Sequence, residues 1–299
     1  MRILVTGGKG MLARTLAATL GASRRHEIHA PGHGDLDVTS AHSVSRMFAE
    51  LRPEVVLHCA AHTKVDKCED ERDLAFAIND LGSANVARAC TQAGARLVAF
   101  STDYVFDGAK DGDYTEFDQP NGGLGVYGQS KWAGECAVRL NCPNHIIARV
   151  SWLYGPGGPS FVHTMLRLHR QGVPLIRVVS DQIGNPTSTP AVAAAVAELL
   201  EHPELKGTFH LTCEGAASWY DFAREIFALA GVEQRVEPCT TAEYPTRARR
   251  PANSCLAKTR LKSAGLAPMP QWQAALRTFL AVELPELERQ ARAAEAERG

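Results

Sequence analysis

The sequence predicts an α/β fold: a doubly wound parallel sheet with a smaller C-terminal α/β domain. Two observations support this prediction. Short apolar runs alternate with helical patterns through the first 150 residues, and a glycine-rich turn follows the first apolar run directly. Both are typical of βαβ units, in which a helix connects two parallel strands.

The expected elements of the first domain, residues 1–150, follow one another at short intervals. Segments at about 175–202 are expected to return to this domain, because residues 175–181, 190–201 and 207–212 again look like strands or helices that could join the first sheet. The other residues from 151 to 299 mainly form the second domain. The pattern predicts strands at 2–6, 26–30, 54–60, 95–101 and 145–150, and helices at 11–20, 40–51, 73–93 and 129–140.

Composition excludes several classes of function. The chain has 299 residues, 45% of them hydrophobic, which is enough for a sizeable buried core. Its 32 basic and 33 acidic residues give a net charge of -1, so no global field favours nucleic acid or anionic membranes. The N-terminus lacks a signal-peptide pattern, and no stretch approaches the roughly 18 apolar residues of a membrane span. We therefore expect a cytoplasmic protein.

Neither the cysteines nor the C-terminal tail indicates a function. The eight cysteines include no Cys-x-x-Cys pair, which indicates reduced thiols rather than a zinc site or a disulfide framework. The tail from Glu283 to Gly299 is rich in Glu, Arg and Ala and has almost no apolar face. We expect it to be a solvated helix.

The glycine-rich turn lies where a dinucleotide would bind. Gly7 permits a tight turn after the first strand, Gly10 lets a pyrophosphate approach the helix N-terminus, and Ala13 packs that helix closely on the sheet. Such a turn can also be a plain connection. Its position directly after the first strand of a βαβ unit favours a Rossmann-type NAD(P) site.

The second strand gives no clear sign of cofactor preference. An acidic residue that binds the ribose is expected about 20 residues after the glycines, but residues 29–33 read His-Ala-Pro-Gly-His. We therefore expect NADPH to bind at least as well as NADH. NADPH is the expected cofactor, and NADH is the alternative. Asp37, followed by Val38, either contacts the adenine or caps the next helix.

A tyrosine and a lysine four residues apart predict a catalytic pair. Tyr127 and Lys131 would lie on one face of a helix, and Thr102 ends a predicted strand at the sheet edge where ligands bind in α/β proteins. A hydride that reaches a carbonyl carbon leaves an alkoxide, which needs a proton donor and a second hydrogen bond. We expect Tyr127 to donate the proton and Thr102 the hydrogen bond. Lys131 and the oxidised nicotinamide are expected to lower the pKa of Tyr127.

With these residues in place, the sequence resembles the extended short-chain dehydrogenase/reductase superfamily, and within it the dTDP-4-dehydrorhamnose reductases. The resemblance covers nearly the whole chain. It implies an oxidoreductase that uses NADPH to reduce the 4-keto group of a nucleotide-linked deoxysugar, namely dTDP-4-dehydro-L-rhamnose to dTDP-L-rhamnose. Its specific marks are five segments in family order, residues 60–67, 101–106, 149–155, 181–187 and 250–254.

The resemblance also implies roles for individual residues. Val65 and Trp152 could equally be core residues. Expected cofactor contacts are Gly7, Gly10, Met11, Leu12, Asp37, Val38, Ala61, His62, Thr63, Tyr127 and Lys131. Expected substrate contacts are Val65, Thr102, Asp103, Trp152, Arg250 and Asn253.

A basic segment near the C-terminus is a candidate for the substrate's diphosphate. Arg247, Arg249 and Arg250 lie close together, and a guanidinium suits bidentate phosphate contacts. The resemblance places this segment near the substrate, with Arg250 as the main contact. The alternative is a solvated basic loop.

The resemblance implies a carboxylate-bound magnesium ion at a dimer contact, but the matching positions are Thr15 and Pro190, neither a useful ligand. We therefore expect no metal, and a monomer or weak homodimer. Two other functions stay open: a non-catalytic NADP-binding regulatory subunit, and a reductase or epimerase for another nucleotide sugar. Intact Thr102, Tyr127 and Lys131 favour an enzyme. Tyr104 occupies the position where related dehydratases carry a Glu, which disfavours dehydration.

Overall fold

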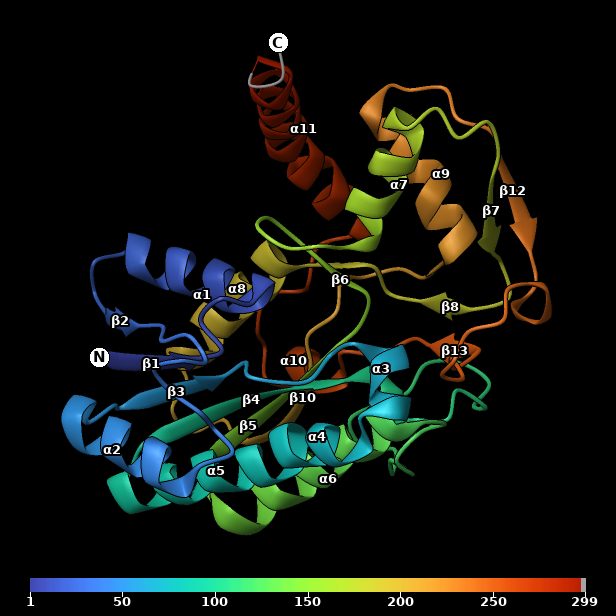
Figure 1. Ribbon diagram of the computed structural model, residues 1–299. Coiled ribbons are helices and arrows are strands. Elements are labelled where there is room, and N and C mark those ends of the chain that lie inside the picture. Colours follow the sequence, from blue (N-terminus) through green and yellow to red (C-terminus); the bar gives the residue numbers. More distant parts are fainter. Residues whose placement is uncertain (297–299) are drawn as a thin grey trace.

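The computed structural model describes residues 1–296, and the side chains of residues 1–287 and 289. Within this part of the chain, six strands form the main sheet in the order β10-β5-β4-β3-β1-β2, and every neighbouring pair is parallel. The expected parallel α/β fold is confirmed (Figure 1). The strands are β1 (Arg2–Thr6), β2 (Glu27–His29), β3 (Val55–His58), β4 (Arg96–Thr102), β5 (His145–Val150) and β10 (Gly207–His210).

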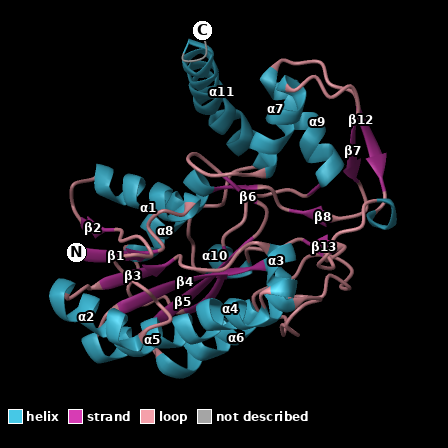
Figure 2. Cartoon of the chain, in the orientation of Figure 1, coloured by secondary structure: helices cyan, strands magenta, loops and turns pink. Residues whose placement is uncertain are grey.

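Helices cover both faces of this sheet, because alternate strand residues point to opposite sides. Ile3 and Val5 face α1 (Met11–Ala22) and α8 (Thr189–Leu200) in one buried cluster. Leu4 belongs to a second cluster on the other face, beneath the remaining helices (Figure 2). These are α2 (Ala41–Leu51), α5 (Gly82–Ala93) and α6 (Val126–Asn141).

The single helix expected at 73–93 is interrupted. It consists of α4 (Arg72–Phe76), a π-helical turn η1 (Ala77–Leu81) and then α5, and it is preceded by the unexpected α3 (Val65–Asp70). The π-turn contains the buried Asn79, whose amide donates a hydrogen bond to Ser130 Oγ on α6 (2.9 Å). A Cβ at Gly134 of α6 would lie 2.1 Å from the Asn79 carbonyl oxygen, so the two helices are in close contact there.

A second lobe lies over the carboxyl edge of the main sheet (Figure 1). Its core is formed by aromatic and aliphatic side chains such as Phe222 and Leu276. Its helices are α7 (Phe161–Arg170), α9 (Trp219–Ala230) and α11 (Trp272–Ala296). Its short strands are β6 (Leu153–Tyr154), β7 (Ile176–Val179), β8 (Ile183–Gly184), β9 (Thr187–Ser188), β11 (Ala217–Ser218), β12 (Val236–Cys239) and β13 (Asn253–Ser254). Short 3-10 turns are η2 (Asp103–Val105) and η3 (Thr241–Glu243).

The expectation that residues 175–181 could join the first sheet is wrong. They form β7, which pairs in parallel with β12 of the second lobe. The later segments do reach the first lobe: α8 packs on α1, and β10 pairs with β5. The short helix α10 (Thr259–Ser263) also contacts β10, and its Leu261 is buried in the first lobe's core. An apolar run alone cannot distinguish between two sheets, because the pairing partner lies about sixty residues away along the chain.

The beginning of the C-terminal tail is not a solvated helix. Glu283 is only 8% exposed, and its carboxylate pairs with His163 Nε2 of α7 (2.9 Å). Leu284 and Leu287 pack against the core of the second lobe. The side chains at 288 and 290–299 lie outside the described residues.

No helix in the described part of the chain combines the length and apolar character needed to cross a membrane. All eight cysteines lie in this part, and each has a free thiol.

The packing of α8 on the first sheet leads to a stability prediction. Leu199 of α8 is fully buried in the cluster shared with α1 and the sheet. Leu199→Ala should lower the free energy of unfolding by about 3 kcal/mol, because it removes buried apolar surface and leaves a cavity. The matched control is Leu140→Ala on α6. Leu140 is 85% exposed, and its loss should change the free energy of unfolding by less than about 0.5 kcal/mol. Equal urea midpoints for the two variants would contradict this prediction.

Candidate functional site

The glycine turn between β1 and α1 forms an anion cradle. Gly7 has φ 67°, and a Cβ there would lie 2.9 Å from the Ala60 backbone. A Cβ at Gly8 would lie 2.1 Å from the Ala30 carbonyl oxygen. Gly10 is the N-cap of α1 and provides no side-chain hydrogen bond to the first turn. Backbone N–H groups are therefore left for a ligand, so the turn fits a dinucleotide pyrophosphate.

A cleft of about 550 Å³ opens from this turn along the carboxyl edge of the sheet. Its walls come from both lobes, and Trp219 of α9 forms part of the far side. Of the expected site residues, those that line it are Gly7, Gly10, Met11, Leu12, Ala61, Thr63, Val65, Thr102, Asp103, Tyr127, Lys131 and Trp152.

The three expected catalytic side chains meet in this cleft. Thr102 is the last residue of β4, whereas Tyr127 and Lys131 occupy the first two turns of α6. Lys131 is buried, and its Nζ donates a hydrogen bond to the Phe100 carbonyl oxygen on β4 (2.7 Å). The ring of Tyr127 meets the ring of Tyr104 edge-on, with centroids 5.4 Å apart. A phenol, a hydroxyl and an ammonium thus share one wall.

The electrostatics of Tyr127 differ from the sequence-based expectation. Burial raises the pKa of Tyr127 strongly, contact with the Thr102 hydroxyl lowers it in part, and Lys131 is not among the groups that shift it. Burial also lowers the pKa of Lys131 to about 8, although Glu135 and Cys59 act to raise it. The protein alone therefore raises the pKa of Tyr127, and the lowering of this pKa by Lys131 together with the oxidised nicotinamide stays a prediction. Tyr127 carries its proton at neutral pH.

Asp103 adds a buried carboxylate to the same wall. The hydroxyl of Thr102 donates to Asp103 Oδ1 (3.0 Å). Asp103 Oδ2 is buried and makes no hydrogen bond among the described residues, and the side chain is only 3% exposed. Burial raises the pKa of Asp103 to about 6, against hydrogen bonds from Ser254 and Thr102. This carboxylate can accept a hydrogen bond from a ligand hydroxyl.

Trp152 has an unusual backbone conformation at the lobe junction. Its φ is 46°, which is rare for a side chain of this size. Its ring stacks on Trp219 with centroids 3.6 Å apart, and a Cβ at Gly184 would lie 2.5 Å from it. The indole is therefore held between Trp219 and Gly184, which fixes one wall of the cleft.

Three expected cofactor contacts do not line the cleft. Asp37 Oδ1 accepts hydrogen bonds from the Thr39 N–H (2.9 Å) and hydroxyl (2.8 Å). It does not cap α2, whose N-cap is Ser40. Val38 is buried in the core beneath Gly82. His62 turns to Glu71, with Nε2 2.7 Å from the carboxylate, while its neighbours Ala61 and Thr63 reach the cleft.

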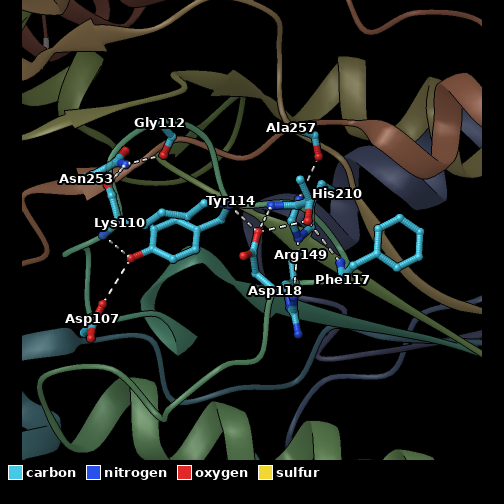
Figure 3. A network of polar contacts seen from close by, with 11 residues as sticks. Asp107, Lys110, Gly112, Tyr114, Phe117, Asp118, Arg149, His210, Asn253 and Ala257 are labelled. Carbon is cyan, nitrogen blue, oxygen red and sulfur yellow. Dashed lines mark hydrogen bonds and ion pairs between the residues drawn. The ribbon is translucent and has the colours of Figure 1, made fainter.

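Two expected substrate contacts also lie outside the cleft. The Asn253 amide donates to the carbonyl oxygens of Lys110 (2.9 Å) and Gly112 (2.8 Å) (Figure 3). Its Oδ1 accepts from the Cys255 N–H. These bonds brace the loop after β4. Because they use the whole side-chain amide, the expectation that Asn253 binds substrate is not supported by its contacts.

Arg250 lines a second hollow of about 270 Å³, which shares Trp219 with the cleft. Its guanidinium donates to Asp66 (2.8 Å) and to the Ala248 carbonyl oxygen (3.1 Å). Arg247 and Arg249 are exposed, and Arg247 pairs with Asp70. Of the three arginines, only Arg250 lines a hollow that adjoins the cleft.

The magnesium site implied by the family resemblance does not fit this chain. The hydroxyl of Thr15 is hydrogen-bonded to the hydroxyl of Thr189 (2.8 Å), and Pro190 follows without a donor atom. Elsewhere in the described part of the chain, His, Cys, Asp and Glu side chains form no cluster of three that could hold a metal ion.

Sequence reasoning missed several residues of the cleft. Tyr104 lines the cleft beside Tyr127. The sequence indicated only that it occupies the position of a Glu in related dehydratases, not that it belongs to the site. Trp219 and Pro159 come from the second lobe, where no motif marked them.

Comparison with known proteins assigns the family. A family model described as "RmlD substrate binding domain" matches residues 1–284. The chain belongs to this family. It is 43% identical over 281 residues to the dTDP-4-dehydrorhamnose reductase of Streptomyces griseus, which covers 92% of this chain and 91% of the relative.

Two other relatives are similar over nearly the whole chain: one whose name gives a different dTDP sugar as substrate, and one whose crystal structure is known. A probable dTDP-4,6-dihydroxy-2-methyloxan-3-one 4-ketoreductase of Streptomyces antibioticus is 40% identical over 295 residues, covering 97% of this chain and 99% of the relative. The crystal structure of the dTDP-4-dehydrorhamnose reductase of Bacillus anthracis in complex with NADP is 39% identical, with a TM-score of 0.91, and covers 94% of this chain and 98% of that chain. The family expected from the sequence is confirmed.

The raised pKa of Asp103 predicts a pH-dependent gain in stability on its removal. Its folded-state pKa of about 6 exceeds the ordinary 3.8, so the buried charge destabilises the fold above pH 6 and this cost disappears as the pH falls towards 4. Asp103→Asn should therefore raise the free energy of unfolding by roughly 2 to 3 kcal/mol at pH 8, and much less at pH 4. Urea denaturation at both pH values measures this difference.

Asp107→Asn is the control of opposite sign. Hydrogen bonds, first that from the Ala109 N–H, lower the pKa of Asp107, so its charge stabilises the fold at pH 8 and this variant should lose stability there. If Asp103→Asn changed the free energy of unfolding equally at pH 4 and pH 8, the buried charge of Asp103 would not destabilise the fold.

Proposed function

We propose that this chain uses NADPH to reduce the 4-keto group of a dTDP-linked deoxysugar, with dTDP-4-dehydro-L-rhamnose as substrate and dTDP-L-rhamnose as product. One observation carries the proposal: Thr102, Tyr127 and Lys131 line one cleft with the glycine turn of a dinucleotide site. The family supports it, as do relatives named dTDP-4-dehydrorhamnose reductase, one of them in complex with NADP.

The residues of the cleft can carry out the proton transfer. NADPH, when bound, supplies the hydride. Tyr127 holds a proton at neutral pH, as an ordinary phenol does, and burial raises its pKa further. It can donate this proton to the oxygen of the reduced carbonyl. Thr102, 5% exposed at the end of β4, can donate a hydrogen bond to the same oxygen when its hydroxyl turns from Asp103 Oδ1. Asp103 Oδ2 can accept a hydrogen bond from a sugar hydroxyl.

The two alternative functions fit the site less well. A non-catalytic NADP-binding subunit would not need a tyrosine, threonine and lysine that meet in one cleft. Action on another nucleotide sugar is the closer alternative, because one relative is named as the 4-ketoreductase of a different dTDP sugar. Turnover with a panel of dTDP, UDP and GDP 4-keto sugars distinguishes these cases.

The cofactor, assembly and location are parts of the same proposal. No acid follows β2 at residues 30–34, and the aliphatic part of Lys9 packs over Gly32, so this loop offers a basic side chain to a 2′-phosphate. This favours NADPH, with NADH possible. We also propose a monomer or weak homodimer, and a cytoplasmic location, with which the free thiols agree.

Removal of the Tyr127 hydroxyl tests the reductase assignment. Tyr127→Phe should lower kcat by roughly 10²- to 10⁴-fold, because it removes the proton donor, and should leave the Kd for NADPH within a few fold. The matched control is Tyr104→Phe, the other phenol on the cleft, which should change kcat less than about tenfold if Tyr127 is the donor. A Tyr127→Phe enzyme that retains most of its kcat would exclude this role.

The diphosphate of the substrate provides a second test. Arg250→Ala should raise KM for the sugar nucleotide about thirtyfold, which corresponds to about 2 kcal/mol for a charged phosphate contact, and should leave NADPH affinity unchanged. Arg247→Ala and Arg249→Ala are the controls, and each should keep KM within about twofold, because these side chains are exposed outside the hollow. If Arg250→Ala also stays within twofold, the loop is only a solvated basic segment.

A further inference from the structure

A buried carboxylate, Glu135, lies behind the catalytic wall and does not line the cleft, so it cannot contact a ligand there. Glu135 of α6 is one turn after Lys131 and is only 3% exposed. Arg149 of β5 binds it in bidentate fashion, Nε to Oε1 at 2.9 Å and Nη2 to Oε2 at 2.8 Å. Burial acts to raise the pKa of Glu135, but the hydrogen bond and charge of Arg149 keep it below the ordinary value. Glu135 is therefore charged at neutral pH.

Stability alone does not account for this ion pair. Transfer of two charges from water into the interior costs several kcal/mol per ion, and well-packed apolar side chains often replace such pairs without loss of stability. We therefore considered which other side chain the Glu135 carboxylate contacts. Its Oε1 also accepts a hydrogen bond from Ser101 Oγ (2.5 Å), the residue directly before Thr102. The carboxylate thus fixes the end of β4 from behind.

Lys131 lies at the same end of β4. Its Nζ is bound to the carbonyl oxygen of Phe100, the residue before Ser101. A void of about 10 Å³ between α6 and β4 is lined by Lys131, Glu135, Ser101 and Ser83. This is room for one water molecule with polar partners on several sides. Glu135 and Lys131 therefore hold two adjacent positions on β4 and face one small polar void.

The charges around Lys131 give Glu135 a defined electrostatic effect. On α6, Glu135 raises the pKa of Lys131, and after β3, Cys59 does so to a lesser extent. His58 of β3 is neutral, because burial lowers its pKa to about 3. Arg149 and Arg139 both contact the carboxylate of Glu135. Without Glu135, Lys131 would lose the carboxylate that raises its pKa against the effect of burial.

We propose that Glu135, held by Arg149, is a positioning residue of the reaction: it keeps the Lys131 ammonium charged and fixes the strand end that carries Thr102. The proposal rests on the reductase function, because it acts through Lys131 and Thr102. Glu135 itself does not line the cleft. Its effect must therefore be visible in the pH dependence, and not only in the rate.

Glu135→Gln tests the charge with little change in shape. Activity that needs a charged Lys131 is lost as the pH rises through the pKa of this lysine, so loss of the counter-charge should move the alkaline limb of kcat/KM to lower pH by roughly one unit or more. At pH 8 we expect about a fivefold or greater loss of kcat/KM, with partial recovery at pH 6. A purely structural role would lower kcat/KM equally at all pH values.

Ser101→Ala is the matched control, because it removes one hydrogen bond and keeps the charge of Glu135. It should lower kcat without moving the alkaline limb. If Glu135→Gln fails to fold, the double variant Glu135→Gln/Arg149→Met removes both buried charges and should show the same alkaline shift, because Glu135 and not Arg149 acts on the pKa of Lys131.

A measurement of NADPH binding tests this proposal even if the proposed reductase function is wrong, because binding needs no turnover of a dTDP sugar. NADPH binding is measured by quenching of tryptophan fluorescence, since Trp152 and Trp219 line the cleft. In Glu135→Gln the Kd for NADPH should begin to rise at lower pH than in the natural sequence, even if no dTDP sugar is turned over. An unchanged pH dependence of both Kd and kcat/KM in a folded Glu135→Gln protein would overturn the proposal.

Discussion

The parallel pairing of β4 between β3 and β5 is the constraint on which the site depends. Six consecutive residue pairs join β4 to β5, from Leu97 opposite His145 to Thr102 opposite Val150. This register places Phe100, Ser101 and Thr102 at the carboxyl edge, where they bind Lys131, Glu135 and Asp103 in turn. A shift of one residue would turn each side chain to the other face of the sheet. The contacts of β4 with Lys131 and Glu135 on α6 would then be lost together.

Burial of this wall sets its chemistry before any ligand binds. Desolvation keeps Tyr127 protonated and leaves Asp103 with a raised pKa, whereas Lys131 stays close to losing its proton. A phenol that carries a proton can act as the proton donor that a carbonyl reduction needs. The second lobe contributes to this burial, because Trp152 and Trp219 close the far side of the cleft.

Local sequence patterns predicted much of this structure. The strands of the first lobe, the glycine turn and the helical spacing of Tyr127 and Lys131 are local features, and their elements formed as expected. Pairings between distant segments were beyond such reasoning, as the partnership of β7 with β12 shows. The direction of single side chains was also beyond it, since His62 turns away from the cleft between two neighbours that reach it. The upward shift that burial gives the pKa of Tyr127 was also beyond it, because desolvation depends on the tertiary packing around the ring.

The return of the chain to its first lobe has a consequence for modularity. Helix α8, strand β10 and helix α10 all belong to the first lobe, although segments of the second lobe precede α8 and separate β10 from α10 along the chain. A fragment ending at residue 150 would therefore expose β5 as an open edge and uncover the apolar surface that α8 buries. Neither lobe is a transferable module. Several chain connections also cross between the lobes, so any relative motion must bend all of them about a common axis. A change in the relative position of the lobes would therefore strain all of these connections at once.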